Sequence, residues 1–177
     1  LAIYQGQGHV GSKNAVERNL NVLENAVIKA KNMGAHLISF SELYLTGYTV
    51  YKEDIPALAE TVDGPSMLRI SKIAKDNEIA ILCPYPEKDG DKYYDSMALF
   101  DKDGSLLSNY RKAHLWGTEE KKKWISGYLD PKEGNAFDVI KVNDFPIGLL
   151  NCYEAEFPEL TRILALKGAK LVVIPTA

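Results

Sequence analysis

Cys152 is the residue of this sequence whose type and position most favour covalent chemistry. It follows residues 145–150, an apolar run that predicts a buried strand, and precedes Phe157-Pro158-Glu159, which opens a helical pattern. A thiol beside a helix N-terminus meets backbone N–H groups and the positive end of a dipole, which favour the thiolate. We therefore expect a thiolate nucleophile at Cys152, although a lone cysteine is more often a small buried hydrophobe.

Two charged residues stand at the ends of other predicted strands. Residues 36–40 form an apolar run that ends at Ser41-Glu42, and residues 105–111 alternate like a strand and lead to Lys112 in a loop. Because α/β folds place ligands at the carboxyl ends of strands, Glu42 and Lys112 are candidate site residues. Taken singly, each is more often an ordinary solvated loop residue.

These three residues lie in segments 41–48, 110–115 and 152–159, which resemble the glutamate, lysine and cysteine motifs of the nitrilase (carbon–nitrogen hydrolase) superfamily. The resemblance runs from residue 3 to the last residue. Two positions depart from the pattern, because Ser41 replaces a usual proline and Glu154 a common aspartate. The resemblance implies an α/β fold over residues 1–177, a nitrilase-like α-β-β-α sandwich of two mixed sheets.

The chemistry that the resemblance implies is hydrolysis of a non-peptide carbon–nitrogen bond without a cofactor. The Cys152 thiolate would attack an amide carbonyl, and Glu42 would carry the protons. The Lys112 ammonium and the backbone N–H of Tyr153 are the candidate donors to the oxyanion. Since Tyr153 resembles amidases more than true nitrilases, we expect a small carboxamide to yield carboxylate and ammonia through a thioester. A nitrile or N-carbamoyl substrate is the alternative.

A second glutamate is implied by the same resemblance, downstream of the lysine and before an aromatic residue and a glycine. Trp124 and Gly127 provide that frame, so Glu120 is the better candidate and Glu119 the alternative. Its expected task is to position the substrate or the catalytic pair. The residues that we expect to line the substrate pocket are Tyr48, Trp116 and Glu154.

Composition excludes several other classes of protein. The chain has 177 residues and a formal net charge of −3, with no basic face for nucleic acid. Its apolar runs fall short of the ~20 residues that cross a bilayer, so we expect no membrane partner. Two cysteines without a pairing pattern indicate a reducing, cytoplasmic location. The three histidines are scattered, and no metal-ligand spacing is present.

Two other motifs in the sequence resemble functional sites but have the wrong context. Residues 6–11 spell G-x-G-x-x-G after a short strand, but the following helix is expected only after Lys13, and the candidate acid Glu42 comes 31 residues after Gly11. Both spacings are wrong for a dinucleotide fold. A papain-like protease would pair Cys152 with His114, but the local cysteine motif of that family is missing.

The element pattern alternates strands with helices. A long amphipathic helix is expected from a cap at Asn14 to about Gly34, and further helices at residues 66–75 and 157–167. Hairpins are expected at residues 93–111 and 137–150. The remaining expected strands span residues 2–5, 36–40, 79–83 and 170–174.

The last predicted strand, residues 170–174, is apolar and β-branched, and the family's domain continues beyond it. We therefore expect residues 1–177 to form the N-terminal portion of the domain and, in isolation, to expose apolar surface. A longer parent chain is expected to form a homodimer or larger homo-oligomer. The competing interpretation is an incomplete or non-catalytic scaffold.

Overall fold

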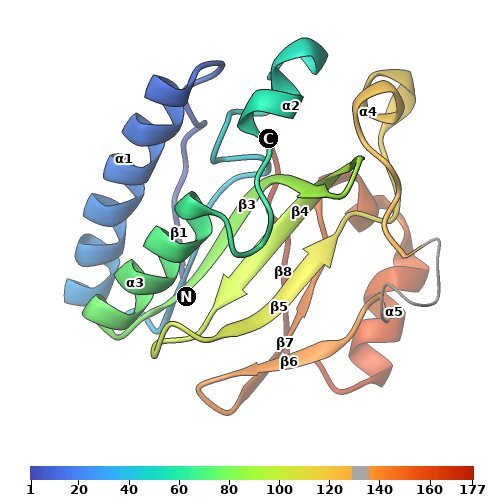
Figure 1. The fold of residues 1–177 in the computed structure, drawn as a ribbon. Helices are drawn as coiled ribbons and strands as arrows, with labels where there is room; N and C mark the ends of the chain where they lie inside the picture. The colour runs from blue at the N-terminus through green and yellow to red at the C-terminus, as the bar shows by residue number, and fades with distance from the viewer. Residues whose placement is uncertain (129–135) are drawn as a thin grey trace.

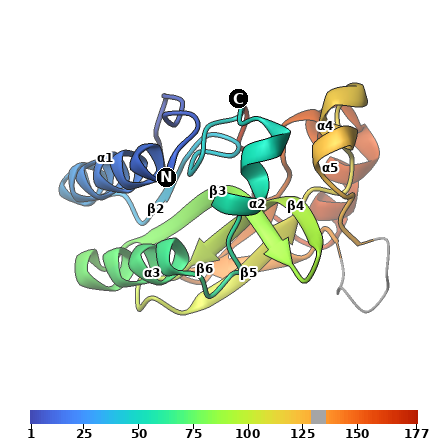
Figure 2. The ribbon, with the colours of Figure 1, turned by 45° about the horizontal axis from the view of Figure 1, so that its top comes forward.

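The computed structural model describes residues 1–128 and 136–177 and contains two mixed sheets with helices on their outer sides (Figure 1). Helices α1 (Lys13–Asn32) and α3 (Pro65–Asn77) lie on one side of the larger sheet, and α5 (Pro158–Leu166) lies beyond the smaller sheet (Figure 2). The expected α-β-β-α sandwich is therefore confirmed.

The larger sheet has the strand order β1-β2-β3-β4-β5. Its strands are β1 (Ala2–Ile3), β2 (Leu37–Ser39), β3 (Ala80–Asp89), β4 (Lys92–Phe100) and β5 (Leu106–Arg111). The first three are parallel, and β3, β4 and β5 pair antiparallel. Since β5 then runs in the same direction as β2, the carboxyl ends of both strands reach the same edge of the sheet, where β4 begins.

The smaller sheet has three strands, β6 (Val139–Val142), β7 (Phe145–Leu149) and β8 (Leu171–Val173), in that order. The expected hairpin is confirmed as the antiparallel pair β6 and β7, and β8 pairs parallel to β7. This connection needs a crossover, which α5 (Pro158–Leu166) provides. The crossover begins directly after the segment that carries Cys152.

The helices form where the apolar spacing predicts them. Helix α1 (Lys13–Asn32) buries Leu20, Leu23 and Val27 against the larger sheet, beside α3 (Pro65–Asn77). Each such buried side chain contributes ~1.5–3 kcal/mol. The expected cap at Asn14 was wrong, because Ser12 holds the extended N-cap conformation. No helix in the described part of the chain is long and apolar enough to cross a membrane.

The middle layer is the interface between the two sheets. Strand β3 alternates its contacts, so Leu82 faces this layer whereas Ile81 and Cys83 face α1 and α3. Opposite Leu82, the smaller sheet contributes Ile147 and Leu149. A strand covered on both faces is apolar at nearly every position, which explains the continuous apolar run of residues 79–83.

Three features differ from the sequence prediction. Strand β3 continues through two prolines to Asp89 and forms a long hairpin with β4, which the prolines had obscured. A short helical segment, η1 (Lys52–Asp54) followed by α2 (Ile55–Leu58), lies in a stretch with no predicted element. The charged run after Trp116 forms α4 (Gly117–Lys123), for which the sequence predicted no helix.

The glycine motif at residues 6–11 has a packing role in this structure. A Cβ on Gly8 would lie 1.9 Å from the backbone oxygen of Tyr44 and 3.0 Å from Asn19 Nδ2. Asn19 is buried and joins this loop to the segment after Glu42, because its Nδ2 donates to the carbonyls of His9 and Leu45, both at 2.9 Å. Gly8 therefore lets the loop of residues 6–11 pack closely against the segment that follows Glu42.

We predict that Gly8→Ala lowers the free energy of unfolding by about 1–3 kcal/mol, because the added methyl group must displace backbone. Urea unfolding followed by circular dichroism measures the change. Gln7→Ala, at an exposed neighbouring position, is the control and should shift stability by less than about 0.5 kcal/mol. Equal stability of Gly8→Ala and the parent chain would contradict the packing role.

Candidate active site

Glu42 lies just beyond the carboxyl end of β2 and is buried, with 1% of its surface exposed. The next residue, Leu43, is fully buried and has a φ of 49°, a left-handed conformation that bulky residues rarely adopt. This turn reverses the chain sharply, and Tyr44 N donates to Ser41 O at 3.1 Å. The Glu42 carboxylate is thus held in the interior by a strained turn.

Lys112 follows β5 and is also 1% exposed. Its Nζ donates to Glu42 Oε1 at 2.6 Å and lies 2.9 Å from Glu120 Oε2 and 3.7 Å from Asp95 Oδ2. Burial alone lowers the pKa of Lys112, but the surrounding acidic groups Asp95, Glu42 and Glu120 outweigh burial and raise that pKa above its usual value. Lys112 is therefore a permanently charged ammonium surrounded by acidic groups.

Glu120 reaches this cluster from α4, whereas the adjacent Glu119 is exposed and pairs with Lys122. Glu120 accepts hydrogen bonds from the Tyr48 hydroxyl at 2.8 Å, from Trp116 N at 2.7 Å and from Lys112 Nζ at 3.0 Å. The expected pocket residues Tyr48 and Trp116 thus both hold Glu120. The Trp116 side chain itself is 55% exposed.

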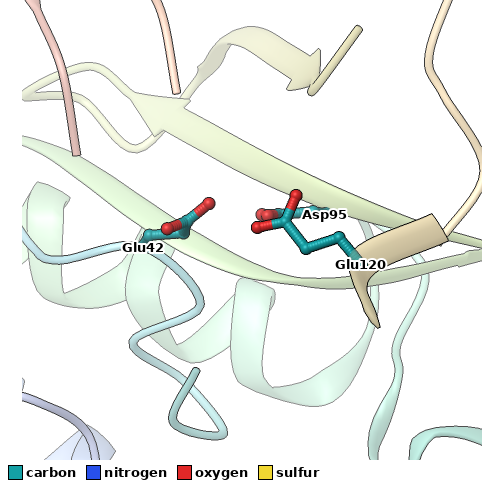
Figure 3. Close-up of side chains that lie close together, drawn as sticks. All are labelled: Glu42, Asp95 and Glu120. Atoms are coloured by element: carbon teal, nitrogen blue, oxygen red, sulfur yellow. The ribbon is translucent and has the colours of Figure 1, made fainter. Parts of the chain in front are cut away.

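Asp95, on β4, joins the cluster and was not expected from the sequence. Its side chain is fully buried, and atoms of Glu42, Asp95 and Glu120 lie within 4.8 Å of one another (Figure 3). Three such carboxylates could hold a cation, but the Lys112 ammonium already lies within 3.7 Å of each of them. We name the four residues Glu42, Asp95, Lys112 and Glu120 the carboxylate–lysine cluster.

Cys152 follows β7 and begins the short helix η3 (Cys152–Glu156). Its φ is 45°, and its backbone N–H donates to Pro175 O at 2.8 Å. Burial, together with the charge and hydrogen bonding of Glu42, raises the pKa of Cys152 to about 11, and Lys112 acts in the opposite direction. The helix N-terminus was expected to favour the thiolate, but burial and the charge of Glu42 outweigh that effect, so the thiol needs a base before it can attack.

Glu154 was expected to line the substrate pocket, and the structure corrects this. It is fully buried and accepts hydrogen bonds from Tyr110 Oη at 2.7 Å, Ala113 N at 2.8 Å and Asn151 N at 2.8 Å. Both of its oxygens are thus used to fasten the loop after Lys112 to the segment that carries Cys152. Tyr153, between Cys152 and Glu154 in the sequence, is half-buried, and its ring makes an edge contact with that of Phe157 at a centroid distance of 5.1 Å.

Comparison with known proteins gives a consistent result over the whole chain. A family model described as carbon–nitrogen hydrolase matches residues 1–177. The hydrolase in the pqqF 5' region of Pseudomonas protegens is 39% identical over 163 residues, covering 92% of this chain and 54% of that protein. The omega-amidase of Mus musculus is 34% identical over 164 residues, covering 90% of this chain and 58% of that protein.

A solved structure also matches. It is a variant of the amidase from Nesterenkonia sp. AN1 that shows Michael addition of acrylamide at the active site cysteine, with a TM-score of 0.79 and 28% identity. The alignment covers 98% of this chain and 65% of that one. The present chain thus spans little more than half the length of the two relatives and about two thirds of the solved structure.

We predict that alkylation of Cys152 by iodoacetamide accelerates with pH toward a midpoint near 11, because burial and Glu42 disfavour the thiolate. Peptide mapping after timed labelling measures the rate. Cys83 provides the internal control, because its thiol is fully buried and its pKa is raised still further by burial. A midpoint below the ordinary cysteine range would contradict the assignment.

Proposed function

Because this chain belongs to the carbon–nitrogen hydrolase family, we propose that it hydrolyses a small carboxamide to a carboxylate and ammonia through a thioester on Cys152. The observation that carries the proposal is the hydrogen bond of 2.6 Å between Lys112 Nζ and Glu42 Oε1 beside the thiol. A buried ammonium, carboxylate and thiol together provide an oxyanion donor, a base and a nucleophile.

The first half-reaction forms the thioester. With a pKa of about 11, roughly one Cys152 thiol in ten thousand is ionised at pH 7, so attack requires a base. Glu42 takes the proton from Sγ as Sγ adds to the amide carbonyl carbon. The oxygen becomes an oxyanion that accepts from Lys112 Nζ and from the N–H of Tyr153, since the N–H of Cys152 is already bonded to Pro175.

The first half-reaction ends when Glu42 passes its proton to the amide nitrogen, the carbon–nitrogen bond breaks, ammonia leaves and the thioester is complete. In the second half-reaction, a water molecule attacks the thioester carbon while Glu42 takes one of its protons. The carbon–sulfur bond breaks, and Sγ recovers the proton from Glu42. The carboxylic acid released gives its proton to ammonia and becomes the carboxylate, and the enzyme returns to its resting state.

Glu120 supports this cycle by holding Lys112. It accepts from Lys112, Tyr48 and Trp116 N at once, which fixes the direction of the ammonium. Tyr48 remains bonded as a phenol, because burial and the neighbouring Glu120 raise its pKa. The task assigned to Glu120 is therefore positioning rather than proton transfer.

We predict that incubation with substrate and acid quenching traps an acyl group on Cys152 and not on Cys83. Intact mass followed by peptide mapping detects the adduct, using a panel of small amides, N-carbamoyl compounds and nitriles to identify the substrate class. Cys152→Ala should form no adduct and release no ammonia. Full turnover by Cys152→Ala would remove the nucleophile from the proposal.

We predict that Glu42→Gln lowers kcat by about 100- to 10,000-fold, because the glutamine keeps the shape but cannot carry a proton. Lys112→Met should lower kcat by at least about 100-fold through loss of an oxyanion donor. Stopped-flow acylation and steady-state ammonia release measure both effects. Glu119→Gln, next to the cluster but exposed, is the matched control and should retain kcat.

A further inference from the structure

The carboxylate–lysine cluster contains more acid than its single ammonium can balance. Glu42, Asp95 and Glu120 surround Lys112, and all four residues are at most 4% exposed. If all three acids were ionised, the buried group would carry two uncompensated negative charges. Such a charge is normally avoided by protonation of one member, since like charges in a shared buried site raise a pKa strongly.

Asp95 is the member that is least well bonded as an anion. Glu42 accepts from Lys112 at 2.6 Å and Glu120 accepts from three donors, whereas Asp95 Oδ2 lies 3.7 Å from Lys112 Nζ, beyond hydrogen-bonding distance. Asp95 Oδ2 and Glu42 Oε2 are both buried and lack an ordinary donor among the described residues. Oxygens of the two carboxyl groups lie within 4.8 Å of each other, so one proton shared between Asp95 and Glu42 would serve both groups.

Asp95 also contacts every segment that carries a proposed catalytic group. Its Oδ1 accepts from Asn151 Nδ2 at 3.0 Å, and Asn151 directly precedes Cys152. Its backbone oxygen accepts from Lys112 N at 2.9 Å. The Glu42 carboxylate lies near that of Asp95 (Figure 3). Asp95 therefore lies at the junction of the base, the oxyanion donor and the nucleophile segment.

We propose that Asp95 is a positioning residue that stays protonated at neutral pH and donates its proton to Glu42, thereby fixing the base against Cys152. This inference rests on the proposed amide hydrolysis. Burial, followed by the charge of Glu42, raises the pKa of Asp95 well above its usual value, which agrees with the geometry. When Asp95 ionises, the hydrogen bond to Glu42 is replaced by repulsion, and the base loses its fixed orientation.

The titratable groups that face Asp95 come from three chain segments: Glu42 after β2, Tyr110 and Lys112 at the end of β5, and Glu120 on α4. Burial and the charge of Glu154 raise the pKa of Tyr110, so its phenol stays neutral. Lys112 is held charged by its acids. Ionisation of Asp95 is therefore the event that we expect to lower kcat as pH rises above neutrality.

Asp95→Asn tests the proposal, because asparagine is neutral at every pH, can donate to Glu42 and can accept from Asn151. We expect Asp95→Asn to retain kcat at neutral pH within about threefold and to lose the fall in kcat on the alkaline side. Asp95→Ala should lower kcat by about 100-fold, since Glu42 is no longer oriented. The exposed Asp89→Asn, on β3, is the matched control and should behave like the parent chain.

The pH dependence of folding stability tests the protonation of Asp95 without any measurement of amide hydrolysis. A carboxyl group whose pKa is raised on folding makes the folded state lose stability as pH rises from the unfolded pKa, about 4, toward the folded value. The urea midpoint of Asp95→Asn should therefore rise relative to the parent chain as pH increases from about 5. This comparison remains valid even if no amide is hydrolysed.

Three outcomes would overturn the proposal. One is a kcat of Asp95→Asn as low as that of Asp95→Ala, which would mean that the negative charge is needed. Another is a fall in kcat at alkaline pH that is the same in Asp95→Asn as in the parent chain. The third is a constant difference in urea midpoint across the pH range. A shift of the midpoint without any amide turnover would instead support the protonated Asp95 and contradict the proposed function alone.

Discussion

The ammonium of Lys112 is the interaction on which the whole candidate site depends. Oxygens of Glu42 and Glu120 both lie within 3.0 Å of Lys112 Nζ, in an interior where either carboxylate alone would be costly to bury. Its charge also acts against the burial that disfavours the Cys152 thiolate. Replacing this single group with a neutral one would leave the acidic side chains of the carboxylate–lysine cluster with no counterion. The segments that carry Glu42, Asp95 and Glu120 are therefore held together around the Lys112 ammonium.

The three strand-end residues could be predicted from the sequence because their signal is local. An apolar β-rich run that ends in an ionisable residue marks Glu42 and Lys112, and the family resemblance links them to Cys152 in order. Asp95 has no such mark, since an acid inside an alternating strand usually faces water. Its burial arises only when α4 and the loop after β2 close over the start of β4, which is a tertiary effect.

Glu154 illustrates a second limit of local patterns, whereas Glu120 does not. Glu119 and Glu120 are adjacent acids in a charged run, but the frame of Trp124 and Gly127 favours Glu120, and α4 turns that residue inward. One hydrogen bond of Glu154, from Asn151 N, closes a local capping box. Its other three, from Tyr110 Oη, Ala113 N and His114 N, come from a distant part of the sequence, which no pattern within its own segment could indicate.

The left-handed backbone at Leu43 and Cys152 bears on the order of events during folding. A residue of this kind costs about 1–3 kcal/mol and persists only where the surroundings enforce it. The surroundings here come from segments about 70 residues apart in sequence, since Lys112 reaches Glu42 across that separation. Such distant contacts carry the entropy cost of closing a long loop. The strained turns can be held only once these contacts are in place, so the geometry at Leu43 and Cys152 depends on tertiary structure and not on their own segments alone.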